Sequence, residues 1–274
     1  MRRGVPVFLA VLCLTPAVAR AQGAPASAPV AHVSASYDAY AAGLQVAEMQ
    51  ARVALDPAAY RMRLSYHTTG LLGALAPGRQ DGGVDGLWER DRASPQRFWG
   101  NGVWRGADRR TEMVFHGGQP EVVELVPPND ADLEPVPAEM QAGTIDSLTA
   151  MAQVLRQVAA TGRCEGTART FDGRRVVALT VRTVGQEDVE PSSRSPFAGR
   201  ALRCDFEGRQ LAGFYRGADR AELEKPKPGS AWFAPVVAGA PPLPIRITFP
   251  TRFVGEGTLY LTSAQPDTQV MAKP

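Results

Sequence analysis

Two of the three cysteines lie far from the N-terminus and could form a structural disulfide. Cys164 and Cys204 stand 40 positions apart, without a CxxC partner or a histidine nearby in the sequence. A zinc site or a nucleophilic thiol needs such neighbours. In an oxidising compartment, a pair of this kind favours a disulfide over a metal site or two free thiols.

Catalytic signatures are missing from the sequence. It contains no GxSxG, SxxK, HExxH or GxxxxGK motif, and no GxGxxG after a strand. His67 could act as a base on the polar face of its strand, but no carboxylate is placed beside it by sequence. A surface histidine is the favoured interpretation, so we expect a non-enzymatic protein without catalytic residues.

Two acidic segments could bind a metal ion, and both are better explained as loops. The run DGGVDG at 81–86 occurs once, whereas calcium-binding repeats of this kind need stacked copies. The run NDADLE at 129–134 offers hard oxygen ligands but lacks the glycine and final glutamate of an EF-hand loop. We therefore expect no metal and no cofactor.

The segment 88–110 interleaves aromatic residues with arginines and holds three of the four tryptophans. Such a mixture can stack on bases, sugars or lipid headgroups. The alternative is an ordinary pair of strands with buried tryptophans and solvated arginines. The candidate patch for an anionic partner consists of Trp88, Arg97, Trp99, Trp104 and Arg105.

The N-terminus has the three parts of a secretory signal peptide. A basic start, an apolar run over 5–14 and the small-x-small site at 19–21 are followed by an Ala/Pro-rich segment. Without residues 1–21 the formal charge falls from +2 to −1, because three arginines leave and no acid does. We expect no nucleic-acid partner for such a chain.

The signal peptide and the amino-acid composition together indicate where the protein is located. Almost all basic residues are arginine, and alanine, glycine and proline are abundant, which is typical of a GC-rich bacterial genome. We expect the periplasm of a Gram-negative cell. No later stretch approaches the roughly 20 apolar residues of a transmembrane helix, so an integral membrane protein is not expected.

Apolar residues at every second position predict a mainly β protein. In 47–55 and 60–67 one face of each run is apolar and the other polar, with a turn at Asp56-Pro57 between them. We predict a large curved antiparallel sheet, either open and barrel-like or a β-spiral. Its concave face is expected to carry Tyr37, Met49, Val53, Met62, Leu64 and Tyr66.

One segment has a helical period instead. In TIDSLTAMAQVLRQVAATG, Leu148, Met151, Leu155 and Val158 form one stripe, Thr144 or Asp146 can cap the start, and a glycine can end it. This predicts one helix packed on the sheet. Asp172-Gly173 predicts a hairpin turn after it.

The chain is predicted to be one domain. Two proline-rich connections, 117–143 and 225–242, resemble surface crossings more than flexible linkers, since alternation resumes after each. We assign 1–21 as signal peptide, 22–33 as linker, 34–265 as a single β-rich domain and 266–274 as tail. The oligomeric state stays open.

Together, several soft motifs resemble the domain of unknown function 3108 family. They are the Tyr-x5-Gly-Leu entry at 37–44, the IDSLTAM helix start, Cys164 followed by FDGRR, Cys204 running into LAGFYRG, and LPIRI at 243–247. The resemblance implies exported bacterial proteins without an established activity or catalytic residues, and it supports pairing of the two cysteines. The architecture is also similar to periplasmic lipoprotein carriers.

Two classes of function follow. The first is a non-enzymatic envelope-associated protein whose curved sheet binds a lipid-like apolar ligand or another envelope component. The second is an envelope hydrolase that uses loop carboxylates, and a scaffold without a ligand is a third alternative.

The disulfide is open to a direct test. Closing a loop of about 40 residues stabilises a fold by roughly 4 kcal/mol in the chain-entropy model. We expect Cys204→Ser to lower the midpoint of thermal unfolding. Equal midpoints for the natural protein with and without reductant would contradict a structural disulfide.

Overall fold

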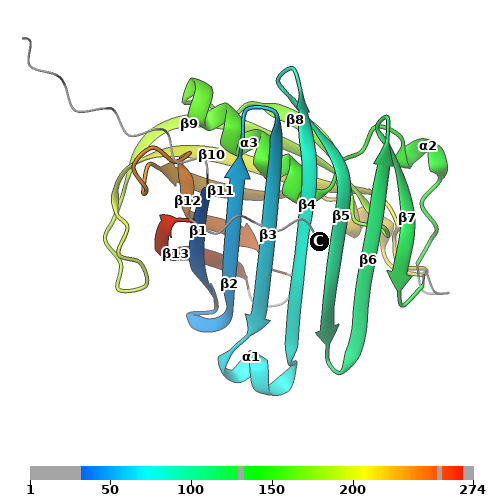
Figure 1. Ribbon diagram of the computed structural model, residues 1–274. Helices are drawn as coiled ribbons and strands as arrows, with labels where there is room; N and C mark the ends of the chain where they lie inside the picture. The colour runs from blue at the N-terminus through cyan, green and yellow to red at the C-terminus, as the bar shows by residue number, and fades with distance from the viewer. Residues whose placement is uncertain (1–31, 129–132, 252–254, 268–274) are drawn as a thin grey trace, which may run out of the picture.

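The computed structural model describes residues 32–128, 133–251 and 255–267 (Figure 1). The predicted signal peptide and nearly all of the predicted linker lie outside the described residues. The strands are β1 His32–Ala41, β2 Leu44–Leu55, β3 Ala59–Thr68, β4 Gly78–Glu89, β5 Arg92–Trp104, β6 Ala107–His116, β7 Gln119–Val126, β8 Gly166–Phe171, β9 Val176–Val189, β10 Gly199–Ala212, β11 Lys227–Ala234, β12 Leu243–Pro250 and β13 Glu256–Pro266. The helices are α1 Gly70–Leu75, α2 Ala138–Gln141, α3 Ser147–Thr161 and α4 Arg220–Leu223.

All these strands form one antiparallel sheet in which the first and last strands are neighbours. The order of the 13 strands is β7-β6-β5-β4-β3-β2-β1-β13-β12-β11-β10-β9-β8. Each half of the chain therefore builds one half of the sheet, and the halves join where β1 pairs with β13. The order is linear, with β7 and β8 at the two ends. The predicted large antiparallel sheet is confirmed.

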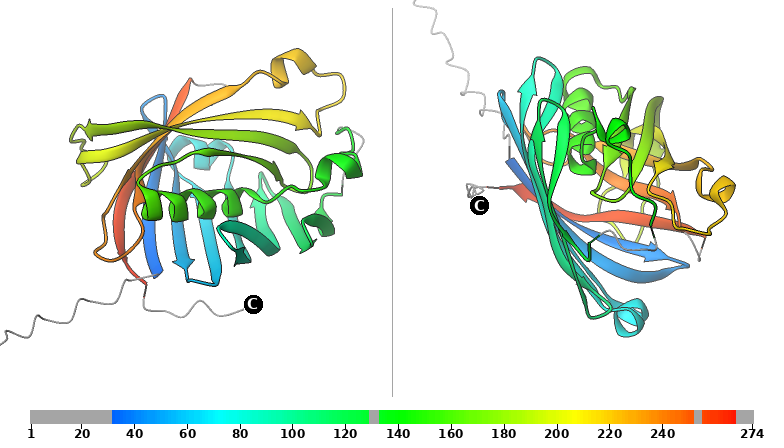
Figure 2. Two further views of the ribbon diagram at one scale, coloured as in Figure 1. Left: turned by 90° about the horizontal axis from the view of Figure 1, so that it is seen from above. Right: turned by 90° about the vertical axis from the view of Figure 1, so that its right-hand side faces the viewer.

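The alternating pattern divides this sheet into an inner and an outer face. In β3, Tyr60 and Met62 are buried, whereas Arg61 and Arg63, which alternate with them, are only half-buried. The inner face of both halves contributes to one hydrophobic core, in which Val53 and Val84 of the first half join Leu202 and Leu243 of the second. Helix α3 lies between the two halves (Figure 2).

The ends of α3 match the sequence prediction. The Asp146 side chain accepts a hydrogen bond from the Thr149 amide at 2.9 Å, and Gly162 has the left-handed φ of 65° typical of a helix C-terminus. The buried stripe differs from the prediction, because Thr149 and Ala152 are buried together with Leu155 and Val158. Three short helices accompany this long one.

A buried chain of hydroxyl groups explains why a threonine faces the core. The Thr149 hydroxyl donates to Asp146 at 2.6 Å and accepts from the Tyr60 hydroxyl at 2.9 Å. None of these three side chains has measurable exposure. A buried tyrosine hydroxyl needs a partner, so this chain fixes the start of α3 on strand β3.

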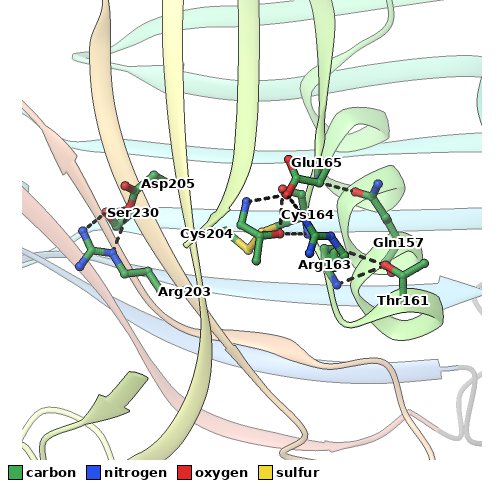
Figure 3. Close-up of a disulfide and its surroundings, with 10 residues drawn as sticks. Gln157, Thr161, Arg163, Cys164, Glu165, Arg203, Cys204, Asp205 and Ser230 are labelled. Carbon is green, nitrogen blue, oxygen red and sulfur yellow. Dashed lines mark hydrogen bonds and ion pairs between the residues drawn. A yellow bond between two sulfur atoms is a disulfide. The ribbon is translucent and has the colours of Figure 1, made fainter. Parts of the chain in front are cut away.

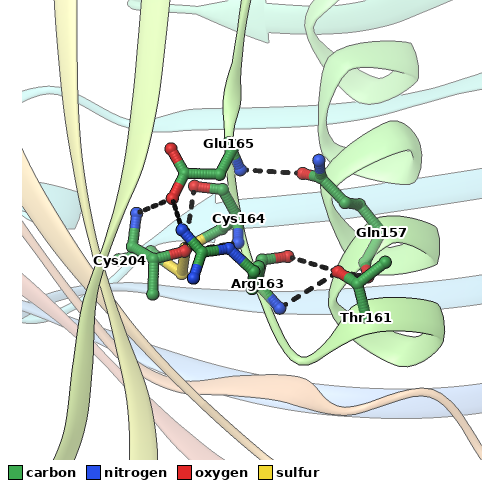
Figure 4. A network of polar contacts seen from close by, with 7 residues as sticks. Gln157, Thr161, Arg163, Cys164, Glu165 and Cys204 are labelled. Carbon is green, nitrogen blue, oxygen red and sulfur yellow. Dashed lines mark hydrogen bonds and ion pairs between the residues drawn. A yellow bond between two sulfur atoms is a disulfide. The ribbon is translucent and has the colours of Figure 1, made fainter.

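The disulfide fixes the other end of α3. Cys164 and Cys204 are bonded, with their Cα atoms 6.1 Å apart, and join the exit of the helix to β10 (Figure 3). The Cys164 amide donates to the Thr183 hydroxyl at 2.9 Å, and the Glu165 amide donates to Gln157 of α3 at 2.9 Å (Figure 4). The predicted disulfide is confirmed.

The two ends of the sheet pack together, and the outermost strand β8 is covered by a chain segment. A smaller core of Met113 and Phe115 from β6 with Phe171, Val176 and Ala212 packs the two ends of the sheet together. The segment before α3 adds to β8, since the Ile145 amide donates to Arg169 and the Phe171 amide donates to Ile145. Covered edges are protected from pairing with other chains.

Removing the tyrosine hydroxyl tests how strongly the chain of hydroxyl groups holds α3. We expect Tyr60→Phe to lower the free energy of unfolding by about 1 kcal/mol, because the Thr149 oxygen loses its donor inside the core. The control is Tyr66→Phe, which removes a half-buried hydroxyl that donates to Gln80 at 3.1 Å. Urea denaturation should show the larger loss for Tyr60→Phe, and equal losses would contradict the idea.

The buried carboxyl predicts a pH dependence. Burial raises the pKa of Asp146 to about 6 from an ordinary value of 3.8, although hydrogen bonds from Thr149 and the backbone lower it. The folded state thus holds the proton more tightly, and this stabilisation is present in acid and lost as the pH rises through about 6.

Asp146→Asn keeps a capping side chain but cannot titrate. Between pH 7 and pH 4 the natural protein should gain on the order of 2–3 kcal/mol of stability relative to this variant. Denaturant unfolding at several pH values measures the difference. Parallel pH profiles would contradict the prediction.

Candidate functional site

The outer face carries a continuous cross-strand row of polar and aromatic residues. The row consists of one residue from each of four strands: Arg203 of β10, Trp232 of β11, Arg246 of β12 and Tyr260 of β13. Each points outward, because its neighbours along the strand are in the core. The register pairs each with the next across the sheet. Tyr260 then pairs with Asp38 of β1.

The first part of this row is a stack of arginine and aromatic groups. The Arg203 guanidinium carbon lies 5.5 Å from the Trp232 ring centre. The Arg246 guanidinium carbon lies 5.8 Å from the Trp232 ring centre and 5.4 Å from that of Tyr260. These distances are within the range of cation–π attraction.

A loop arginine extends the stack to β1. The Arg194 guanidinium carbon lies 4.4 Å from the Tyr40 ring centre and 6.0 Å from that of Tyr260. The two tyrosine rings meet edge to face at 5.7 Å. We call this stack the arginine–aromatic ladder; all its members are half-buried, and they are Tyr40, Arg194, Tyr260, Arg246, Trp232 and Arg203.

Hydrogen bonds also hold members of the ladder in place. The Trp232 indole N–H donates to Glu187 at 2.7 Å, and Arg194 donates to the Gly43 carbonyl at 3.1 Å. Arg246 donates to the Glu190 carbonyl at 3.4 Å, but its buried Nε has no hydrogen-bond partner among the described residues. An unsatisfied buried N–H costs about 1–3 kcal/mol.

A cleft of about 410 Å³ adjoins the ladder at Arg203. Asp205 lines this cleft and accepts hydrogen bonds from Ser230 at 2.8 Å and from Arg203 at 3.0 Å (Figure 3). Burial would raise the pKa of Asp205, but hydrogen bonds from Ser230 and Arg203 and the charges of Arg203 and Arg182 hold it below its usual value. The carboxylate is therefore stabilised in its charged form.

The row continues as charged residues over the first half of the sheet. Asp38 pairs with Glu48, Glu48 with His67 and His67 with Arg79, all on the outer face. Burial, and then the charge of Glu48, raise the pKa of Asp38. Asp38 and Glu48 both line a cleft of about 500 Å³. Both come from strands, whereas the hydrolase alternative expected carboxylates from loops.

A family comparison assigns the chain. The family described as "Protein of unknown function (DUF3108)" matches residues 36–262. The chain belongs to this family. The resemblance expected from the sequence is thereby confirmed.

Solved structures show which fold this DUF3108 chain has. It is similar to a beta-barrel-like protein of the DUF1849 domain from Brucella abortus, with 12% identity, a TM-score of 0.51, and coverage of 88% of this chain and 100% of the other. A protein described as exported with a YmcC-like fold, from Bacteroides fragilis, has 11% identity, a TM-score of 0.33, and coverage of 85% and 95%.

A domain described as outer membrane lipoprotein-sorting, from Vibrio parahaemolyticus, has 9% identity, a TM-score of 0.25, and coverage of 87% and 86%. Only the first likeness bears on the fold. Comparison with curated proteins finds no match. The disulfide of the DUF3108 chain is typical of an extracytoplasmic location.

The six residues expected on the concave face of the DUF3108 sheet divide into two groups. Tyr37, Val53 and Met62 are buried in the main core. Met49, Leu64 and Tyr66 are half-buried, and Met49 packs against that core. Other core side chains and α3 pack around Tyr37, Val53 and Met62 on the inner face. These three residues therefore stabilise the fold.

The sequence-predicted tryptophan patch is distributed over different surfaces. Trp88 is in the core, where its indole N–H donates to the Asp56 and Ala59 carbonyls and Arg156 of α3 stacks on it. Trp99 is on the outer face near Arg63, and its indole nitrogen has no partner within the described part of the chain.

The other three members of that patch also lie apart. Arg97 pairs with Glu112 on the outer face at 2.9 Å. Trp104 ends β5, and Arg105 stands in the turn that follows. The described residues contain no group of three metal-ligating side chains and no helix that is long and apolar enough to cross a bilayer.

Sequence reasoning missed the arginine–aromatic ladder. Its members come from positions 40 to 260, so no local motif contains them. The alternation in LPIRI does show that Arg246 points away from the core. Which aromatic rings stand beside it depends on strand order and register.

Proposed function

We propose that this protein is a non-enzymatic component of the periplasmic envelope that binds a protein partner on the outer face of its sheet, at the arginine–aromatic ladder. This favours an envelope partner over a lipid-like apolar ligand. Three of the residues expected to hold such a ligand are packed in the core.

The composition of the ladder carries this proposal. Its three arginines, two tyrosines and one tryptophan are the residue types that dominate the binding energy of protein interfaces. Five of them lie on consecutive strands, and Arg194 of the β9–β10 loop stacks beside them, so a partner could contact all of them at once.

The ladder is also preorganised. Stacked rings and hydrogen-bonded guanidinium groups lose little side-chain freedom on binding, which lowers the entropic cost of association. The neighbouring cleft at Asp205 supplies charged groups at its border. A buried centre of aromatic residues with a polar rim is the usual anatomy of a protein interface.

Site-specific photocrosslinking in cells tests the proposal. A photoreactive residue at Thr248, on the outer face two positions from Arg246, should give one discrete protein adduct. The same residue at Val123, which is 58% exposed on β7, should give none. Equal adducts at both positions would contradict a specific docking face.

A matched pair of charge variants sharpens this test. Arg246→Gln removes the central guanidinium and should reduce the Thr248 adduct about tenfold, as expected for a contact worth 1.4 kcal/mol. Arg175→Gln removes a similar group, which lies 5.2 Å from the Tyr215 ring centre outside the ladder, and should leave the adduct unchanged. An adduct that is insensitive to Arg246→Gln would overturn the proposal.

A further inference from the structure

Large apolar side chains are exposed together at one end of strands β2 to β5. Leu71 and Leu75 of α1 are 63% and 70% exposed, Leu44 at the start of β2 is 56% exposed, and Trp104 at the end of β5 is 36% exposed. Figure 1 shows α1 and the β1–β2 and β5–β6 turns along the lower edge of the molecule. We call these four residues the apolar tip.

Backbone contacts join these segments into one surface. The Arg105 amide donates to the Pro77 carbonyl at 2.8 Å, which holds the β5–β6 turn against the exit of α1. A Cβ atom on Gly78 would meet the Trp104 ring at 2.4 Å, so the ring lies directly over that glycine. The Thr69 amide donates to Val46 of β2 at 2.9 Å, which places α1 beside the β1–β2 hairpin.

Arginines outnumber acidic residues beside the apolar tip. The segment 69–78 with α1 contains no charged residue, and Arg79 follows it. The β5–β6 turn and its flanks expose Arg105 and Arg109, with Asp108 as the acid between them. Arg105 has a φ of 52°, the left-handed conformation of this turn.

Single exposed leucines are ordinary on protein surfaces, but a group of them rimmed by polar residues marks an interaction site. Leucine and tryptophan on projecting turns can enter the boundary between lipid headgroups and acyl chains. Arginines beside them can contact phosphate groups, and anionic lipids add attraction. The positive charge of these arginines therefore favours a bilayer that contains anionic lipids.

We propose that the apolar tip docks on the surface of an anionic phospholipid bilayer. Leu71 and Leu75 enter the interface, Trp104 lies at headgroup level, and Arg79, Arg105 and Arg109 contact phosphates. The attachment is peripheral and reversible. It uses a surface separate from the arginine–aromatic ladder, so a protein partner could bind while the molecule is on the membrane.

Co-sedimentation with vesicles of phosphatidylglycerol, compared with phosphatidylcholine alone, tests this proposal. The double variant Leu71→Ser with Leu75→Ser should bind phosphatidylglycerol vesicles at least about tenfold more weakly than the natural protein, since two leucines leave the interface. Arg105→Gln with Arg109→Gln should weaken binding and its dependence on salt.

The controls lie at the opposite ends of β4 and β5. Leu87 is 47% exposed and nine residues from Gly78, roughly 30 Å along the strand. Leu87→Ser and Arg92→Gln should bind vesicles like the natural protein. All variants share the same N-terminal segment, so any contribution from it cancels, and thermal unfolding checks that each is folded.

Each alternative result overturns the proposal. Absence of binding to phosphatidylglycerol, or equal binding by the tip variants and their controls, would exclude the tip as a lipid contact. Equal binding to both lipids would exclude the role of the arginines. If sedimentation velocity without lipid shows that the leucine variant breaks a dimer, the tip is an interface between copies of this chain. The crosslinking result at Thr248 is independent of these outcomes.

Discussion

The fold depends on helix α3 being held against the inner face of the sheet. A sheet of 13 strands has a large apolar face that must be removed from water, and the helix fills the space between its two halves. The buried contact of Tyr60, Thr149 and Asp146 fixes the start of the helix, and the Cys164–Cys204 disulfide fixes its exit. Both halves of the chain are thereby joined to one core.

That arrangement determines where binding can take place. Around α3 the inner face is occupied by core residues such as Val53, Met62 and Leu202, so little of it is free for a ligand. The outer face of the second half carries charged and aromatic side chains instead. The arginine–aromatic ladder lies there across five consecutive strands and the β9–β10 loop, half-buried and held by cation–π contacts and hydrogen bonds.

Features that depend on residues close together in sequence could be predicted, whereas features that depend on distant residues could not. Strands, the Asp172-Gly173 hairpin and the limits of α3 depend on near neighbours, and they agree with the structure. The buried stripe of α3 was less predictable. Thr149 faces the core because the Tyr60 hydroxyl, 89 residues away in sequence, needs a partner there. The tryptophans of 88–110 divide between core and surface for a similar reason, since α3 covers Trp88 but not Trp99.

The sequence by itself determined the β class, the capped helix, the paired cysteines and the family, because periodicity, capping and cysteine chemistry are local properties. Tertiary structure alone decided that β1 pairs with β13 and that α3 occupies the inner face. It also decided that Arg246 stands between Trp232 and Tyr260. Those contacts depend on strand order and register, which are set by how the whole apolar surface is buried and not by any single segment.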